Sequence, residues 1–341
     1  MSRRPGSDSP LTAWLFIDSV SSLDFNHRVF AAELARRGVS VHLGLLNSVA
    51  LLDSDVWVQG VTWDGEGTVD PESLSWEPVQ SPDVGWMMNQ PHESVSRCVW
   101  QILWRLNQHC FFVNDIAGLF FLNSKTNLSM LDSRRNSAGL FVANDYQVLK
   151  GAIARRSDST WILKPPNSGA GADVFILRPR SDNFDALLQS VTGNADAILE
   201  LNARALQGFV GRYAAAQEYV PAAAREVTRV LVAGGEVITS YGRRPRSGEH
   251  RTNYTHGGEL VTGRKLTADE IEVCNLASVN LQNYGIRFAG LDIAGNSLLE
   301  VNLLNPGGIC NAAEAAQGTL TSRVVDILFE SYRNWRGNDA V

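Results

Sequence analysis

The stretch Gly290-Leu-Asp-Ile-Ala-Gly-Asn-Ser-Leu-Leu-Glu-Val-Asn302 is typical of two short strands joined by a polar turn. Because side chains alternate between the two faces of a strand, the second strand presents Glu300 and Asn302 on one face. If Gly295-Asn296-Ser297 is a three-residue hairpin loop, Asp292 of the first strand lies directly opposite Glu300. The hairpin then brings two carboxylates and an amide to the same face of a sheet.

A divalent cation would explain why two carboxylates face each other, because like charges at facing positions of a hairpin repel. A set of oxygen ligands favours Mg²⁺, which proteins commonly share with substrate phosphates. The same three-residue loop pairs Ala294 with Leu298. The hairpin therefore predicts a nucleotide site, and the alternative interpretation is a solvated polar strand face.

Length and composition restrict the class of protein. A chain of 341 residues can form two or three domains, and 44% hydrophobic and 19% charged residues are typical of globular proteins. The net charge of −6 argues against broad nucleic-acid binding. No apolar run approaches the roughly 20 residues that cross a bilayer. Four widely spaced cysteines form neither a disulfide scaffold nor a zinc motif, so a cytoplasmic location is predicted.

The N-terminal third has the pattern of a parallel α/β domain. A strand at Ala13–Asp18, an amphipathic helix at Phe25–Arg37 and a strand at Val39–Leu46 form a βαβ unit. No GxGxxG motif follows the first strand, so dinucleotide binding by that motif is not supported. A helix at Ser94–Asn107 and a strand at Phe111–Asn114 complete a domain that ends near residue 120.

The pattern changes after residue 120. Two strands, a long helical stretch and a hairpin are predicted at Trp161–Pro165, Val174–Leu177, Asn183–Ala215 and Arg229–Tyr241. Residues Gly242–Gly258 are polar and basic, as expected of a mobile loop. Thr267 and Glu270 form a capping box that starts a helix through about Asn283, which leads into the hairpin.

Two segments suggest contacts with an anion. The small residues of Asn167–Ala172 would let backbone N–H groups approach a phosphate, with Lys164 three residues earlier. This loop lacks the ending of a Walker P-loop, and a tight turn is the alternative. The run Arg243–Asn253 holds four arginines, which suits a hinged lid over an anion or, alternatively, a solvated basic surface.

Taken in order, these motifs resemble those of ATP-grasp ligases, and within that superfamily bacterial glutathione synthetases. The matching pieces are Trp161-Ile-Leu-Lys-Pro165, Ala216-Gln-Glu-Tyr-Val-Pro221, Arg229-Val-Leu-Val232, His256-Gly-Gly258 and the opening hairpin. The resemblance implies an α/β (α+β) fold, namely the ATP-grasp fold with an N-terminal Rossmann-like domain. The implied domains are an N-terminal pre-ATP-grasp domain (1–120), a small lid subdomain (121–215) and a C-terminal catalytic subdomain (216–341).

The resemblance also implies ATP and Mg²⁺ as cofactors, with two metal ions and Mn²⁺ as a substitute. By position, the implied ATP-binding residues are Lys125, Lys164, Asn167, Gly169, Gly171, Gln217, Glu218, Tyr219, Val220 and Glu226. The two lysines match contacts to the phosphates, and Gln217 to Val220 match the segment that borders adenine. Glu226 is the candidate ribose contact, although the family has its acid at the next position, which is Val227 here. The implied metal ligands are Asp292, Glu300 and Asn302.

Four further residues match catalytic positions of the family. Arg229 and Arg244 match arginines near the phosphates and the acyl group, and Arg251 and Asn253 match lid residues that meet the substrate or the γ-phosphate. The implied reaction joins a carboxylate to an amine through an acyl phosphate and releases ADP and phosphate. The protein then aligns the reactants and stabilises negative charge, without a covalent nucleophile.

The substrate-selecting positions depart from the family. Met88 stands where an arginine is expected, and Glu259 replaces a basic residue. We therefore expect a ligase for an amino acid or small peptide other than the glutathione precursors. The alternatives are a glutathione synthetase with an unusual pocket and a non-catalytic ATP-binding scaffold. The expected partners are ATP and small substrates, without nucleic acid or membrane, and a homodimer or homotetramer is typical of the family.

Overall fold

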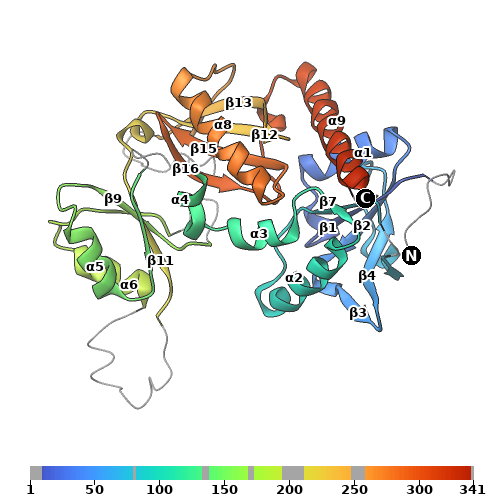
Figure 1. The fold of residues 1–341 in the computed structure, drawn as a ribbon, viewed down its shortest axis with the longest axis horizontal. Helices are drawn as coiled ribbons and strands as arrows, with labels where there is room; N and C mark the ends of the chain where they lie inside the picture. The colour runs from blue at the N-terminus through green and yellow to red at the C-terminus, as the bar shows by residue number, and fades with distance from the viewer. Residues whose placement is uncertain are drawn as a thin grey trace, which may run out of the picture.

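The computed structural model describes residues 10–79, 82–132, 138–167, 173–193, 211–246 and 258–338. Within these ranges the chain forms three β-sheets, and each sheet is built from a separate stretch of sequence. Figure 1 shows the N-terminal sheet and the second sheet at opposite ends of the long axis. None of the described helices combines the length and the apolar character needed to cross a membrane.

The N-terminal sheet has the strand order β3-β4-β2-β1-β6-β7, and β5 pairs with β4. The predicted βαβ unit is confirmed, because β1 (Thr12–Ile17) and β2 (Ser40–Leu45) are parallel and α1 (Phe25–Arg36) connects them. The other strands are β3 (Ala50–Leu52), β4 (Asp55–Thr62), β5 (Ser75–Pro78), β6 (Val84–Met87) and β7 (Phe111–Phe112). Helices α2 (Glu93–Asn107) and α3 (Ile116–Leu122) follow β6 and β7.

The second sheet has the order β10-β9-β11-β8 and is antiparallel throughout. Its strands are β8 (Leu140–Ala143), β9 (Trp161–Lys164), β10 (Phe175–Leu177) and β11 (Ala214–Glu218). Helices α5 (Tyr146–Ala154) and α6 (Phe184–Thr192) pack on the sheet and close a core of their own around Trp161 and Leu188. The short segment η4 (Lys125–Asn127) and helix α4 (Leu128–Leu131) lead into this sheet from α3.

Much of Asn183–Ala215 was predicted to be helical; residues 194–210 lie outside the described ranges, and the last two residues belong to a strand. Helix α6 stops at Thr192, because Gly193 adopts a left-handed conformation with φ of 70°. Ala214 and Ala215 belong to β11, where they are fully buried between β8 and β9. Burial in the centre of a sheet has overridden the high helix propensity of alanine.

The third sheet has the order β14-β13-β12-β15-β16. Its strands are β12 (Val227–Ala233), β13 (Glu236–Arg244), β14 (Glu259–Val261), β15 (Phe288–Ala294) and β16 (Ser297–Asn302). The predicted capping box starts α8 (Ala268–Asn283), and a second long helix, α9 (Glu314–Asn338), ends the described chain. The predicted loop begins later than expected, because Gly242 and Arg243 are paired with both β12 and β14, and Arg244 is paired with β14.

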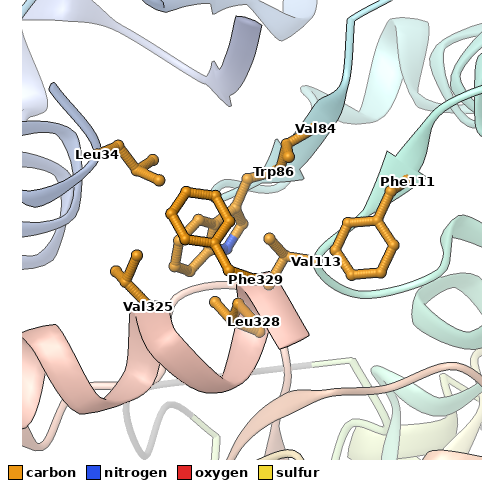
Figure 2. Close-up of a pocket in the computed structure, with 8 residues that line it drawn as sticks. All are labelled: Leu34, Val84, Trp86, Phe111, Val113, Val325, Leu328 and Phe329. Atoms are coloured by element: carbon orange, nitrogen blue, oxygen red, sulfur yellow. The ribbon is translucent and has the colours of Figure 1, made fainter. Parts of the chain in front are cut away.

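The first and third sheets share their hydrophobic cores. Phe288 of β15 makes edge-to-face contacts with Phe30 of α1 and Trp86 of β6, at centroid distances of 5.5 and 5.7 Å. Helix α9 lies beside α1 and covers the same region, where it leaves an apolar cavity of about 10 Å³. Figure 2 shows the side chains that line this cavity, among them Phe329 of α9 and Trp86 of β6. Space of that size holds one water at most, so α9 packs closely against α1 and the first sheet.

Asn114 joins the first and third sheets by hydrogen bonds. Its Oδ1 accepts from the backbone N–H of Arg287 at 2.8 Å and of Phe288 at 2.9 Å. Its Nδ2 donates to the carbonyls of Phe288 at 2.7 Å and Leu303 at 2.6 Å. All four bonds are buried or nearly so, and they link the end of β7 to the start of β15.

Replacement of Asn114 by alanine should therefore be strongly destabilising, because it leaves several buried backbone groups without partners. We expect Asn114→Ala to lower the free energy of unfolding in urea by about 3–5 kcal/mol. The exposed Asn183, which makes no side-chain cap at α6, provides the control, and Asn183→Ala should change stability by less than about 0.5 kcal/mol. Equal stability of the two variants would contradict the role of Asn114.

Candidate functional site

The β15–β16 hairpin places Asp292 opposite Glu300, as predicted, and it also pairs Gly290 with Asn302. The predicted loop is wrong, because Ala294 pairs with Ser297 and only Gly295-Asn296 connect the strands. Gly295 has a φ of 56°, which suits a two-residue turn. A register shift next to Asp292 leaves one extra residue in β16, and this bulge restores the expected pairing of the two acids.

Asp292 is buried between two arginines. Arg229 of β12 donates from Nη2 to Oδ2 at 2.9 Å and from Nε to Oδ1, and Arg243 of β13 approaches Oδ1 at 2.7 Å. Burial acts to raise the pKa of Asp292, but the charges of Arg229 and Arg243 outweigh it and hold the pKa well below its usual range. Burial likewise acts to lower the pKa of Arg229, and Asp292 reverses this to give a raised pKa.

Glu300 has a separate counter-charge. Its Oε1 lies 3.2 Å from Nζ of Lys125, which is 7% exposed. The repulsion expected between Asp292 and Glu300 is therefore offset by cations of the protein itself. The facing acids alone do not require a metal ion between them.

The second predicted lysine reaches the same hairpin from β9. Nζ of Lys164 donates to Oε1 of Gln217 at 2.8 Å, and Gln217 donates to the carbonyl of Leu299 in β16 at 3.3 Å. Burial is the largest influence on Lys164 and, together with the charge of Lys125, lowers its pKa to about 8, against the opposing effects of Glu300 and Asp292. Lys125, Lys164, Gln217 and the hairpin thus converge from four separate stretches of chain.

Arg243 belongs to this cluster, whereas the resemblance to the family implied this role for its neighbour Arg244. Nε of Arg244 pairs with Glu226 at 3.0 Å, and the Arg244 side chain is 55% exposed. The pairing of β12 with β13 could have identified Arg243. Arg229 lies opposite Tyr241, and Arg243 is two residues further along β13, so its side chain lies on the same face of the sheet as that of Arg229. Gly290 leaves room for the cluster, because a Cβ there would lie 3.3 Å from Cδ of Arg229.

The remaining predicted residues have the following positions. Glu226 accepts hydrogen bonds from Arg244 and Arg264. Glu218 accepts hydrogen bonds from Arg156 at 2.9 Å and from Ser159 at 2.6 Å. Tyr219 and Val220 follow β11, and the N–H of Tyr219 donates to the carbonyl of Thr160 at 2.8 Å. Asn167 is exposed just after β9. Gly169, Gly171, Arg251 and Asn253 lie outside the described residues.

Two buried polar atoms of this site lack a hydrogen-bond partner within the described ranges, namely Nδ2 of Asn302 and Nε of Arg243. Such atoms indicate that a ligand or water completes the site. For a hard cation, Glu300 and Asn302 offer oxygen donors, and Oδ2 of Asp292 accepts one bond from Arg229. No group of three His, Cys, Asp or Glu side chains suited to a metal occurs in the part of the chain that the structure describes.

The buried charges predict an order of stabilities. Asp292→Asn leaves two buried guanidiniums without a counter-charge and should cost about 3–5 kcal/mol in urea unfolding. Arg243→Leu leaves Asp292 paired with Arg229 and should cost less. The control is Arg244→Leu, which removes an exposed ion pair worth about 0–1 kcal/mol. A cost for Arg244→Leu as large as that for Asp292→Asn would contradict this arrangement.

Comparisons with known proteins identify the family. Residues 135–317 match the model of the prokaryotic glutathione synthetase ATP-grasp domain. A glutathione synthetase of Synechocystis is 25% identical over 322 residues, which cover 86% of this chain and 91% of that one. A glutathione synthetase of Neisseria meningitidis is 28% identical over 182 residues, which cover 53% of this chain and 52% of that one.

Solved structures show the same fold. D-cycloserine synthetase DcsG superposes with a TM-score of 0.59 at 13% identity, covering 93% of this chain and 99% of that one. The ATP-grasp ligase PsnB, complexed with a minimal precursor, Mg and ADP, gives 0.58 at 14% identity and covers 96% and 100%. An ATP-grasp RimK domain protein of Sphaerobacter thermophilus gives 0.58 at 17% identity and covers 93% and 98%. These likenesses confirm the predicted ATP-grasp fold.

The family match covers more than half of the chain. ATP-grasp ligases form C–N bonds with ATP and Mg²⁺, so the predicted enzyme class and cofactors are confirmed. This chain belongs to the prokaryotic glutathione synthetase ATP-grasp family.

Proposed function

We propose that this protein is a carboxylate–amine ligase that acts on an amino acid or small peptide other than the glutathione precursors. The observation that carries the proposal is the convergence of Lys125, Lys164 and Arg243 on the Asp292–Glu300 hairpin. These buried cations surround a site with unpartnered polar atoms, which suits a polyanion such as a triphosphate.

The reaction that this arrangement supports has two steps. A carboxylate oxygen of the acyl donor attacks the γ-phosphorus of ATP, the bond to the β,γ-bridging oxygen breaks, and ADP leaves. The amine nitrogen then attacks the acyl carbon, inorganic phosphate leaves, and the nitrogen loses a proton. Neither step needs a covalent nucleophile from the protein, so catalysis consists of alignment and of stabilisation of negative charge.

In this proposal Lys125 and Lys164 contact the ATP phosphates, and Arg229 and Arg243 stabilise charge on the transferred group. Glu300, Asn302 and Oδ2 of Asp292 hold Mg²⁺, which would neutralise the phosphate oxygens. Gln217 is held between Lys164 and β16, so it aligns the segment through Val220 that would border adenine. The lid assignments to Arg251 and Asn253 remain predictions, as do the domain boundaries near residues 120 and 215.

The substrate proposal rests on the departures from the family. Met88 is 1% exposed and packs in the core, so no charged or polar group is offered at the position where the resemblance expects an arginine. Glu259 is exposed on β14 opposite Arg244, and it adds a negative charge. Relatives named glutathione synthetase favour glutathione synthesis as the second candidate.

Magnesium-dependent ADP release separates these candidates. Purified protein should release ADP with one or more amino-acid or peptide pairs and only weakly with γ-glutamylcysteine plus glycine. Turnover that is fastest with γ-glutamylcysteine plus glycine would favour glutathione synthesis. ATP binding without turnover on any pair would favour a scaffold.

Glu300→Gln should lower ADP release by at least about 100-fold, because it removes a charge from the proposed metal site while it keeps the shape of the side chain. The variant should retain the thermal stability of the wild type to within a few degrees. The exposed Glu272 of α8 provides the matched control, and Glu272→Gln should keep full activity. Activity of Glu300→Gln near that of the control would exclude the metal assignment.

The lowered pKa of Lys164 predicts a pH dependence of ATP binding. The amine is protonated below pH 8 and loses its charge above it, so affinity for ATP should fall about tenfold between pH 7 and pH 9. Lys164→Arg keeps the charge and should abolish this fall in titration calorimetry. Lys150, whose side chain is 42% exposed and pairs with Asp185, provides the control, and Lys150→Arg should retain the dependence of the wild type.

A further inference from the structure

The N-terminal sheet contains a point at which its connections reverse direction. Strand β1 lies between β2 and β6 and is parallel to both. The chain leaves β1 through α1 to reach β2 on one side, and it later enters β6 on the other side. Open α/β sheets bind ligands beyond the carboxyl ends of the two strands at such a reversal. We call the polar residues that follow these strands, Asp18 and Asn89, the switch-point edge.

Asp18 offers a carboxylate at this edge. It is exposed and follows directly after the buried strand β1. Its Oδ1 accepts from the N–H of Ser19 at 2.7 Å and from Oγ of Ser22 at 2.9 Å. No bond to Oδ2 is made within the described ranges. The side chain is thus held by one oxygen, and the other oxygen is open to a ligand.

Asn89 is held at the same edge by a buried histidine. The N–H of the preceding residue, Met88, donates to the carbonyl of Phe16, which places Asn89 next to the end of β1. Nε2 of His27 lies 2.9 Å from Oδ1 of Asn89, and Nδ1 of His27 lies 2.7 Å from Asp24. His27 is 1% exposed, so the pair with Asp24 fixes its ring and, through the ring, the amide of Asn89.

The same group of residues connects the edge to the catalytic hairpin. Oδ2 of Asp24 accepts from Nδ2 of Asn305 at 2.7 Å, and Asn26 donates to Oδ1 of Asn305 at 2.7 Å. Asn305 follows Asn302 of the hairpin by three residues. A molecule at the switch-point edge is therefore fixed relative to the site at which the γ-phosphate would lie.

The charge at the edge is negative. The segments 18–24, 88–92 and 303–308 contain two aspartates and neither lysine nor arginine. A carboxylate placed here would meet only like charge, whereas an ammonium group would gain a counter-charge from Asp18. The switch-point edge therefore favours a cationic ligand that can also donate hydrogen bonds.

We propose that the switch-point edge binds the free α-ammonium group of the acyl donor, with Asp18 as counter-charge and Asn89 as a hydrogen-bonding partner. An ammonium paired with a carboxylate keeps its proton and cannot act as the attacking amine, so it belongs to the acyl donor. The donor is then a free amino acid or a peptide with a free N-terminus. His27 is a positioning residue, and the proposal rests on the ligase function above.

Binding measurements without ATP test the proposal on the full chain. The probes are the protein amino acids and their dipeptides with glycine, each compared with its N-acetyl counterpart by titration calorimetry. We expect at least one free-amine probe to bind, and its N-acetyl counterpart to bind at least tenfold more weakly. Asp18→Asn should weaken the free-amine probe about tenfold and leave the N-acetyl probe unchanged. The exposed Asp55 of β4 provides the control, and Asp55→Asn should bind as the wild type does.

His27 needs a separate comparison, because its loss could disturb the fold. His27→Leu should weaken the free-amine probe, and His27→Gln, which can still reach Asn89, should restore the affinity at unchanged thermal stability. Equal binding of free and acetylated probes, unchanged binding by Asp18→Asn, or no binding of any probe would overturn the proposal. Mg-ATP binding is measured on the same preparations, and its absence would count against the ligase function instead.

Discussion

The buried carboxylate of Asp292 between Arg229 and Arg243 is the interaction on which the site depends. It joins three neighbouring strands of the third sheet, β15, β12 and β13, at the point where their common face changes from apolar to polar. Two guanidiniums and one carboxylate leave an excess positive charge in a region removed from water. Such an excess is costly in the free protein and favourable once a polyanion is bound.

The position of the two acids in the hairpin could be predicted from the sequence, whereas the cations that accompany them could not. Strand alternation and an assumed three-residue loop predicted that Asp292 lies opposite Glu300. The loop is one residue shorter than assumed, but a bulge in β16 adds one residue, so the two acids still face each other. The opposition does not by itself require a metal ion, because each acid has a cation of the protein beside it. Arg229 and Lys125 lie 63 and 175 residues from their acidic partners, and local sequence contains no signal for ion pairs of such separation.

Elements with a strong local pattern were predictable to within a few residues, as α1, α2 and α8 show. The alanines of β11 were not, because their strand conformation depends on neighbours on both sides of the sheet. The contacts of His27 with Asn89 and of Asp24 with Asn305 were equally hidden, since each joins segments that lie far apart in the sequence. The fold was therefore more readable from sequence than the polar network around the site.

The uneven sharing of cores has a mechanical consequence. The first and third sheets are joined by Phe288, Asn114 and α9, whereas the second sheet encloses a core of its own and contacts the rest through residues such as Leu140 and through the hydrogen bond from Gln217 to Leu299. Apolar contacts resist sliding and separation more than a few hydrogen bonds do. A rotation of the second sheet as one unit would therefore disturb few buried contacts, and it would move Lys164 relative to the nucleotide that we propose at the hairpin.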